Sequence, residues 1–488
     1  MTIPYGHIKA LPMSTPTLRH SAPFFAAASV LVLSACASLP PAQAARVAKA
    51  PQSYETAQTL AAPTADWPAD AWWAAYGDAQ LNALEDEALK GSPTLAAAEA
   101  RLRRAQALVA QAKSADLPQV SLGASVAESK QSYNAGIPPA FVPHGYNDIG
   151  RLALDASWEL DFFGKNRAAV AAATSEAKAA QADAAQARLT LSTAVASTYA
   201  ELSRLYAQRD VAAAAVSLRE QTSNLVSKRV ANGLDTKAES EQAAAGPPAS
   251  KAELSAIDEQ IALTRNALAA LVGAGPDRGL AITRPATASI KPFGLPDNLP
   301  ANLIGRRPDV VAAKWRAEAA TSRTKQAKAM FYPDINLTGF IGVQSLYLDK
   351  LFSSGSDIGQ VGPALRLPIF EGGRLRAGLR GAEADRDAAV ASYDAALTQA
   401  LREVADVTAS EKALTSRLAD ARQALTANEN AYRIARLRYE GQLSTYQSVL
   451  LAEQSVLAQR RVVADLESRA FTLDIALIRA LGGGFTGA

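Results

Sequence analysis

The sequence predicts a protein of mixed α and β structure, mainly α, whose architecture occurs twice along one chain. Two observations predict this class. An alternating, strand-like stretch runs directly into a helical stretch that is far longer than an ordinary helix. The same combination returns roughly 210 residues later, and a return at a fixed offset is typical of an internal duplication.

The first copy of this combination begins near residue 151. From there to residue 161 apolar and polar residues alternate, and a period of two predicts a strand with one apolar and one polar face. The apolar set comprises Leu152, Leu154, Ala156, Trp158 and Leu160. An alanine-rich helical pattern then extends from Phe163-Gly164 to about Ala231. It predicts a helix of roughly 65 residues and about 100 Å, whereas typical globular helices have about 11–12 residues.

The second copy begins with an alternating stretch at residues 361–374, and a helical pattern follows from Leu375 to about Arg438. Inside that helix the apolar positions recur at spacings of three and four that keep to sevens, with Glu411 as the one polar member. Such a repeat predicts helices that supercoil around their neighbours. The repeating positions are Leu397, Ala400, Leu401, Val404, Val407, Leu414, Leu418, Ala421 and Leu425.

The N-terminal residues 1–35 are typical of a lipoprotein signal peptide. An apolar core from Ala22 to Leu33 follows basic residues and leads into a lipobox that ends in Cys36, the only cysteine. We therefore expect Cys36 to carry a lipid anchor, palmitate included; a chance cysteine after an ordinary signal sequence is the alternative. By resemblance to bacterial lipoproteins, Ala37 after the cysteine favours sorting to the outer membrane. Met13 is a second candidate start.

Residues 36–77 are rich in Pro and Ala and predict an extended tether, docked by an aromatic packing patch at its end. The first repeat, residues 78–275, follows. It predicts a helix to about residue 115, strands over about 119–128 and 151–161, and a long helical hairpin. The hairpin turns at Asn232-Gly233, and its returning helix contains Gly246-Pro247-Pro248, which should break or kink it.

A connector rich in Gly and Pro spans residues 276–300. The second repeat, residues 301–483, predicts a helix headed by Arg307-Pro308-Asp309 and strands over about 334–343 and 358–370. It ends in a second helical hairpin, in which Arg438 to Thr445 matches Arg229 to Thr236 of the first. Residues 484–488 are a tail.

Composition excludes several classes of function. The formal net charge of +3 is small for 488 residues, so nothing favours a nucleic-acid partner. Two of the three histidines, His7 and His20, lie in the signal segment, and His144 stands in a loop without a metal-ligand cluster. Phosphate-loop and nucleophile-elbow motifs are absent from the sequence. We therefore expect no catalytic site, no metal and no cofactor.

A membrane role would have to come from the strands or the lipid anchor. After residue 35 no apolar run reaches the roughly 18 residues of a spanning helix. Four strands cannot close a barrel, and an open edge in lipid leaves backbone groups without hydrogen bonds. The strands therefore form either a soluble sheet or a barrel to which several chains contribute.

These residues carry a resemblance to the outer membrane factor family, the TolC-like efflux lipoproteins of NodT type. The lipobox, the two glycine-containing junctions between strand and helix, and the motifs GRRPDV and RYEGQLSTYQSVLLAEQ are similar to that family over about residues 67–483. The resemblance implies a homotrimeric outer-membrane β-barrel, four strands per chain and 12 in all, continuous with a periplasmic α-helical coiled-coil barrel. It implies a periplasmic adaptor (membrane fusion protein) and an inner-membrane pump, chiefly of the resistance-nodulation-division class, as partners.

The resemblance also implies where the functional residues lie. The tips of the hairpins would dock the adaptor, and a tunnel gate would lie close by; plain helix capping and solvated helix faces are the alternatives. The tip positions are Asn232, Gly233, Leu234, Gly441, Gln442 and Leu443. The gate positions are Glu239, Gln447, Ser448 and Leu451, and Arg438 and Tyr439 match residues that hold neighbouring hairpins together. Glu239 falls near one gate position where the family often has a carboxylate, but Leu451 holds the other, with Ser448 and Gln447 nearby, so we expect a partly apolar constriction.

Three other functions stay open on the sequence alone. The same conduit could serve an ATP-driven or major-facilitator exporter, or type I protein secretion. In a different class, the chain could be a structural helical lipoprotein of the periplasm. The alternating strands argue against this last alternative, because a helical stalk has no need of a lipid-like strand face.

Overall fold

The computed structural model describes residues 39–41, 44–286, 290 and 293–487. The chain divides into two compact units. The first holds residues 113–169 and 323–383, and the second holds residues 45–112, 170–322 and 384–488. Each unit thus combines segments from both predicted repeats.

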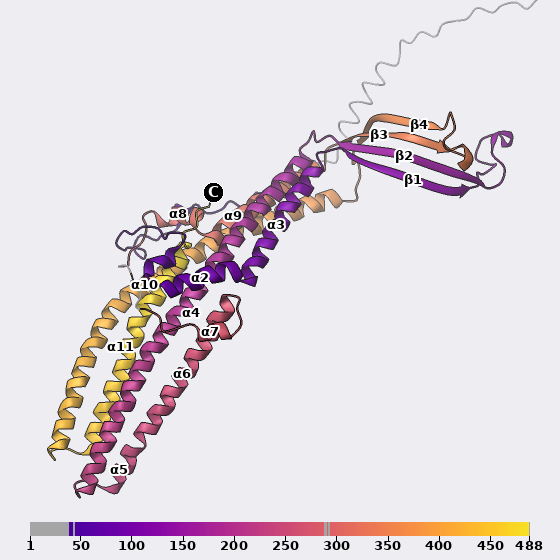
Figure 1. Cartoon of the computed structure of the whole chain (residues 1–488). Helices are drawn as coiled ribbons and strands as arrows, with labels where there is room; N and C mark the ends of the chain where they lie inside the picture. Colours follow the sequence, from indigo (N-terminus) through magenta and orange to yellow (C-terminus); the bar gives the residue numbers. More distant parts are fainter. Residues whose placement is uncertain (1–38, 42–43, 287–289, 291–292, 488) are drawn as a thin grey trace, which may run out of the picture. The chain divides into compact units, whose positions relative to one another are not determined.

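The first unit contains an antiparallel sheet of four strands in the order β1-β2-β3-β4 (Figure 1). The strands are β1 Gln119–Ser129, β2 Asn147–Glu159, β3 Asp334–Ser345 and β4 Asp357–Arg366. β2 and β3 come from different halves of the chain and pair in the centre of the sheet. β1 and β4 are therefore the two edge strands.

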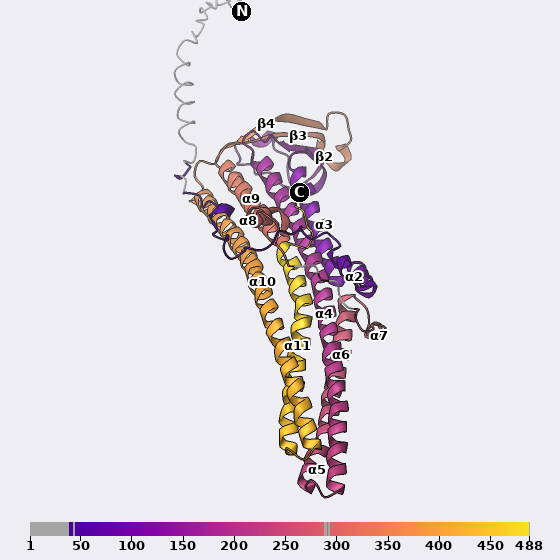
Figure 2. The ribbon, with the colours of Figure 1, turned by 90° about the vertical axis from the view of Figure 1, so that its left-hand side faces the viewer.

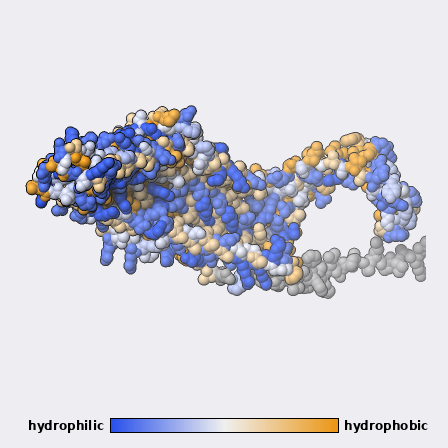
Figure 3. Space-filling view, turned by 90° about the horizontal axis from the view of Figure 1, so that it is seen from below, coloured by the Kyte–Doolittle hydropathy of each residue, from blue (hydrophilic) through white to orange (hydrophobic). Residues whose placement is uncertain are grey.

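One face of the sheet is apolar and open to its surroundings, as the alternation predicted. The register aligns Leu122, Leu154 and Ile341 across three strands, and their side chains are 68%, 47% and 69% exposed. Figure 3 shows the apolar residues gathered over the strands. The opposite face carries Ser121, Asp155, Phe340 and Gln360 in register, so it is polar apart from one aromatic residue of β3 in this row. Each predicted strand therefore has the predicted pair of faces.

Two predicted strand limits were wrong. β4 ends at Arg366 and not at residue 370, so Leu367 and Ile369 lie outside the strand. Pro368 stands two residues past this end and lacks the N–H that a further ladder bond would need, whereas Pro363 inside β4 is tolerated on an edge strand. β2 begins at Asn147, four residues before the predicted start, because its first residues are polar and the backbone pairing alone includes them.

The helices begin with α2 Ala79–Gly91 and α3 Pro93–Ser114, separated by Ser92 where the sequence predicted a break. The first hairpin consists of α4 Lys165–Ala231, α5 Lys237–Ala244 and α6 Gly246–Leu271. After α7 Asp277–Leu280, α8 Leu299–Arg306 and α9 Pro308–Ala329, the second hairpin consists of α10 Arg374–Glu440 and α11 Tyr446–Leu481. α4 and α10 each have 67 residues. No described helix is both long enough and apolar enough to span a membrane.

In the second unit α4 runs beside α6, and α10 beside α11, in both views of the ribbon (Figures 1 and 2). The predicted seam of α10 is buried: Leu397, Ala400 and Val404 are fully enclosed. Leu414 and Ala421 continue the seam in a further cluster with α11. The predicted aromatic patch is also confirmed, because Trp72, Trp73 and Tyr76 are buried in the core beside α2 and α4.

The two prolines of the returning helix have a local explanation. α5 ends at Ala244, and Gly246 and the prolines form the first turn of the new helix α6. N–H groups in a first turn have no partner within the helix, so Pro247 and Pro248 remove no hydrogen bond there. A Cβ at Gly246 would lie 3.3 Å from the Arg219 side chain of α4, so glycine permits close packing at this step.

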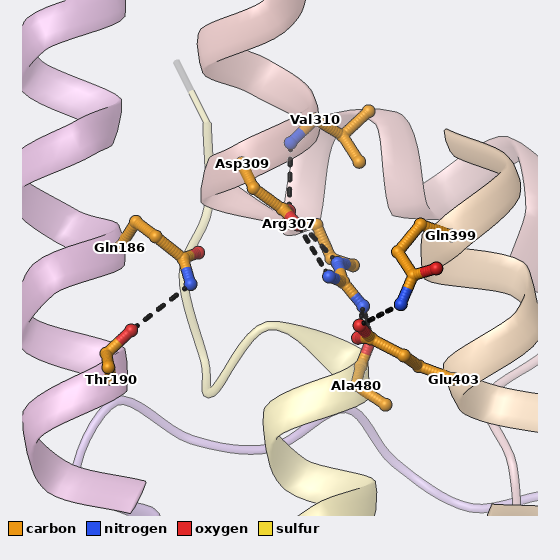
Figure 4. A network of polar contacts seen from close by, with 8 residues as sticks. All are labelled: Gln186, Thr190, Arg307, Asp309, Val310, Gln399, Glu403 and Ala480. Carbon is orange, nitrogen blue, oxygen red and sulfur yellow. Dashed lines mark hydrogen bonds and ion pairs between the residues drawn. The ribbon is translucent and has the colours of Figure 1, made fainter. Parts of the chain in front are cut away.

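Arg307 of the GRRPDV motif links the start of α9, the middle of α10 and the end of α11 (Figure 4). Its buried guanidinium forms ion pairs of 2.6 Å with Asp309 and with Glu403 of α10, and donates to the Ala480 carbonyl of α11 at 3.2 Å. Burial opposes the charge of Arg307, but these bonds outweigh it and raise the pKa of the guanidinium. The motif therefore has a structural role that its sequence did not reveal.

Glu85 of α2 should make stability depend on pH. It is fully buried, neither carboxylate oxygen has a hydrogen-bond partner, and burial raises its pKa to about 9 against the opposing charge of Arg188. Protonated Glu85 contributes its full stabilisation to the folded state when the pH is below the pKa of the unfolded chain's glutamate, about 4.3. This stabilisation is lost as the pH rises toward about 9, by about 1.4 kcal/mol per pH unit.

We expect Glu85→Gln, which mimics the protonated acid, to make the melting temperature depend less on pH between pH 5 and 9 than it does in the wild type. Melting of the purified protein across this range measures the effect. Glu99→Gln, at an exposed position of α3, is the control. Parallel profiles for wild type and Glu85→Gln would contradict a protonated Glu85.

Candidate functional site at the hairpin tips

Both long helices end in the same backbone turn. At the first tip the Leu234 N–H donates to the Arg229 carbonyl at 2.9 Å, and at the second the Leu443 N–H donates to the Arg438 carbonyl at 2.7 Å. In each turn a second N–H donates to the carbonyl three residues earlier, from Gly233 to Val230 and from Gln442 to Tyr439, so both turns are Schellman caps. The caps leave Leu234 46% and Leu443 71% exposed. Each tip therefore presents one apolar side chain on a fixed turn.

The two turns differ at the position that requires the left-handed conformation. Gly233 occupies it in the first tip with φ of 72°, whereas Gln442 occupies it in the second with φ of 63°. A side chain there costs about 1–2 kcal/mol. Gly441 has ordinary backbone geometry, and a Cβ there would lie 3.4 Å from the Leu437 carbonyl oxygen, so the turn itself does not require glycine at this position. The match between residues 229–236 and 438–445 already places Gln442 opposite Gly233.

The two tips are joined within one chain by Arg229, Asp235 and Tyr439. Arg229 forms an ion pair of 2.9 Å with Asp235 and donates to the Tyr439 carbonyl at 2.9 Å. The Tyr439 hydroxyl donates to Asp235, and the Arg229 guanidinium lies 4.3 Å from the ring centre. Tyr439 and Arg229 are buried. We call this group the inter-hairpin clamp, because it connects α4 and its turn to α10.

The charges in the clamp stabilise one another. Burial by itself raises the pKa of Asp235, but hydrogen bonds from Arg229 and Tyr439 outweigh it and hold that pKa below its usual value. The same bonds raise the pKa of Arg229. Both groups are therefore ionised at neutral pH, and the clamp is complete under ordinary conditions.

Sequence analysis identified Tyr439 and missed Arg229 and Asp235. The match between Arg229 and Arg438 could have pointed to the missing cation. Arg438 itself is exposed and, among the described residues, forms no hydrogen bond or ion pair with the first hairpin through its side chain. Any contact it makes with a neighbouring chain stays a prediction.

The proposed gate residues differ in their surroundings. Gln447, Ser448 and Leu451 are exposed and share one face of α11, since they are three and four residues apart. Glu239 instead closes a capping box at the start of α5: its carboxylate accepts from the Thr236 N–H at 2.8 Å. The cap gives Glu239 a structural role that the sequence analysis did not assign.

The remaining tip residues Asn232, Gly233, Gly441 and Gln442 are all exposed. Cys36, the expected lipidation site, lies outside the described residues.

The comparison with known proteins decides the family. The model of a family described as outer membrane efflux protein matches residues 84–274 and 299–483. The chain belongs to this family. The family consists of outer membrane efflux proteins, which are components of transport systems.

Relatives of this outer membrane efflux protein match from 76% to 94% of its length. The fusaric acid resistance protein FusA of Burkholderia cepacia is 38% identical over 379 residues, 76% of this chain and 71% of FusA. The multidrug resistance outer membrane protein MdtP of Escherichia coli K12 is 30% identical over 471 residues, covering 94% and 95%. The crystal structure of the outer membrane protein VceC from Vibrio cholerae has a TM-score of 0.81 and 48% identity, covering 86% of this chain and all of that one.

Proposed function

We propose that three copies of this chain form a passive duct from the periplasm across the outer membrane. The two open edges of the sheet carry the proposal. Among the described residues β1 pairs only with β2, and β4 only with β3, while one face exposes a band of apolar side chains. In lipid each unpaired backbone group costs several kcal/mol, so edge strands of neighbouring chains must pair.

The helical hairpins extend the duct and receive the cargo. The exposed Leu234 and Leu443 dock a periplasmic adaptor, and the exposed face with Gln447, Ser448 and Leu451 lines the constriction. An inner-membrane pump of the resistance-nodulation-division class supplies the energy. The cargo is a small organic compound, in keeping with the resistance proteins among the relatives.

Efflux in cells tests this function. A strain deprived of its own outer-membrane channel should regain resistance to an exported drug when it produces this chain together with its adaptor and pump. The chain without the pump should give no resistance, because a passive duct has no energy source. Resistance that persists without the pump would contradict the proposal.

Lipidation of Cys36 is a separate proposal, motivated by the lipobox at residues 33–36. Cys36→Ser should abolish the acyl modification and leave the signal segment uncleaved by the lipoprotein peptidase. Mass spectrometry of the N-terminal peptide measures both. An acylated N-terminus in the variant would reject this site.

A further inference from the structure

An aromatic cavity lies where the segment 65–76 meets the C-terminal end of α11, and none of its lining residues belongs to the hairpin tips. Its volume is about 650 Å³, within the range of about 300–1,000 Å³ that small-molecule sites occupy. Trp67, Trp72, Tyr76 and Phe293 supply aromatic walls, and Leu477 supplies an aliphatic one. Protein interiors are ordinarily close-packed, so a space of this size within one unit is large enough to admit a small organic molecule.

The cavity separates two hydrophobic clusters. Trp72 and Tyr76 belong to the cluster that contains α2 and the middle of α4, and Leu477 belongs to the cluster around α8 and α10. Trp67 and Phe293 pack at the border of the second cluster. Because both walls are held by buried side chains, the cavity is preformed and does not depend on an exposed loop tip.

The polar groups of the cavity are acidic. Asp474 lines it and accepts a hydrogen bond of 2.6 Å from the Tyr76 hydroxyl, and the exposed Asp66 stands at its rim. Among the described lining residues there is no Lys, Arg or His. Arg306 lies outside the lining with its guanidinium 4.9 Å from the Trp67 ring centre, so this aromatic surface already attracts a cation on one side.

We propose that this cavity binds an organic ammonium ion with an apolar arm. Aromatic rings around a carboxylate are the surroundings that quaternary ammonium groups favour, because the ring faces and the carboxylate both attract positive charge. The aliphatic end of α11 then receives the apolar arm. The bound ion bridges the segment 65–76 and α11. This site is distinct from the hairpin tips and does not depend on the proposed duct.

A matched pair of probes tests the charge that the site selects. Benzyltrimethylammonium and neopentylbenzene have nearly the same shape, and only the first is charged. Calorimetric titration of the purified full-length protein should give saturable binding of benzyltrimethylammonium. Asp474→Asn keeps an oxygen that accepts from Tyr76 and should weaken this binding about tenfold, which is about 1.4 kcal/mol.

Two further variants make the result specific. Asp465→Asn changes another carboxylate of α11, one that pairs with Arg204 at 3.2 Å and does not line the cavity, and should leave binding unchanged. Trp67→Leu keeps an apolar wall but removes an aromatic ring. It should weaken the binding of benzyltrimethylammonium more than the binding of neopentylbenzene. Absence of binding, equal affinity for both probes, or equal losses in Asp474→Asn and Asp465→Asn would each overturn the proposal.

Discussion

Gly233→Trp combined with Gly441→Trp should abolish efflux in a strain that relies on this channel. The two substitutions place large side chains beside Leu234 and Leu443, on the turns proposed to dock the adaptor. Gly233 also has φ of 72°, so tryptophan strains that turn in addition to blocking it. Drug susceptibility at equal protein levels measures the effect, and we expect a loss of resistance to the level of the channel deletion.

The geometry of the two turns supplies controls that separate bulk from strain. Gly441 has ordinary backbone angles, so Gly441→Trp adds bulk without strain, whereas Gly233→Asn adds little bulk at a left-handed position that asparagine tolerates. We expect the first variant to impair efflux and the second to retain it. Full efflux by the double tryptophan variant would show that the tips do not dock the adaptor.

Arg229→Ala should open the resting channel. It removes the guanidinium that joins α4, Asp235 and the Tyr439 carbonyl, and it leaves the Asp235 carboxylate largely buried with the tyrosine hydroxyl as its remaining clamp partner. Breaking a deeply buried ion pair costs about 3–5 kcal/mol. For a pair near a hairpin tip we expect on the order of 2 kcal/mol, because solvent is closer there. Entry of a large antibiotic into cells should increase.

Lys228→Ala is the matched control, since Lys228 is the exposed neighbour of Arg229 on the same helix.

The clamp should also show a defined pH dependence. The pKa of Asp235 is held below its usual value, so the stability it contributes is present above about pH 4 and is lost as the pH falls through the lowered pKa. Unchanged permeability in Arg229→Ala would mean that the clamp does not hold the tips together.

The sequence predicted those parts of the fold that depend on local patterns. The strands were evident because one face is apolar over the whole sheet, and Leu154 and Ile341 occupy it as expected. The long helices were evident from their unbroken alanine-rich pattern. The limit at residue 370 failed because the alternation of Leu367 and Ile369 continues past the strand, where Pro368 prevents pairing.

The candidate site was less predictable because it depends on contacts between distant residues. Tyr439 and Asp235 are 204 positions apart, and no local pattern pairs them. Similarly, the left-handed angle of Gln442 is hidden in a sequence where Gly441 stands beside it. Glu239 was assigned to the gate from its position alone, although Thr236-Lys237-Ala238-Glu239 is the sequence pattern of the capping box that the structure contains.

Conductance in planar lipid bilayers, with the mass of the purified protein in detergent, tests the central claim most directly. We expect a protein of three chains, each of 51.1 kDa before processing, with a small resting conductance that increases in Arg229→Ala and in Glu239→Ala. The increase should be larger for Arg229→Ala, because Arg229 joins the two hairpins through Asp235 and the Tyr439 carbonyl, whereas Glu239 caps only its own helix α5. A monomer that never inserts into the bilayer would contradict the account, because the four strands would then form a sheet outside the membrane.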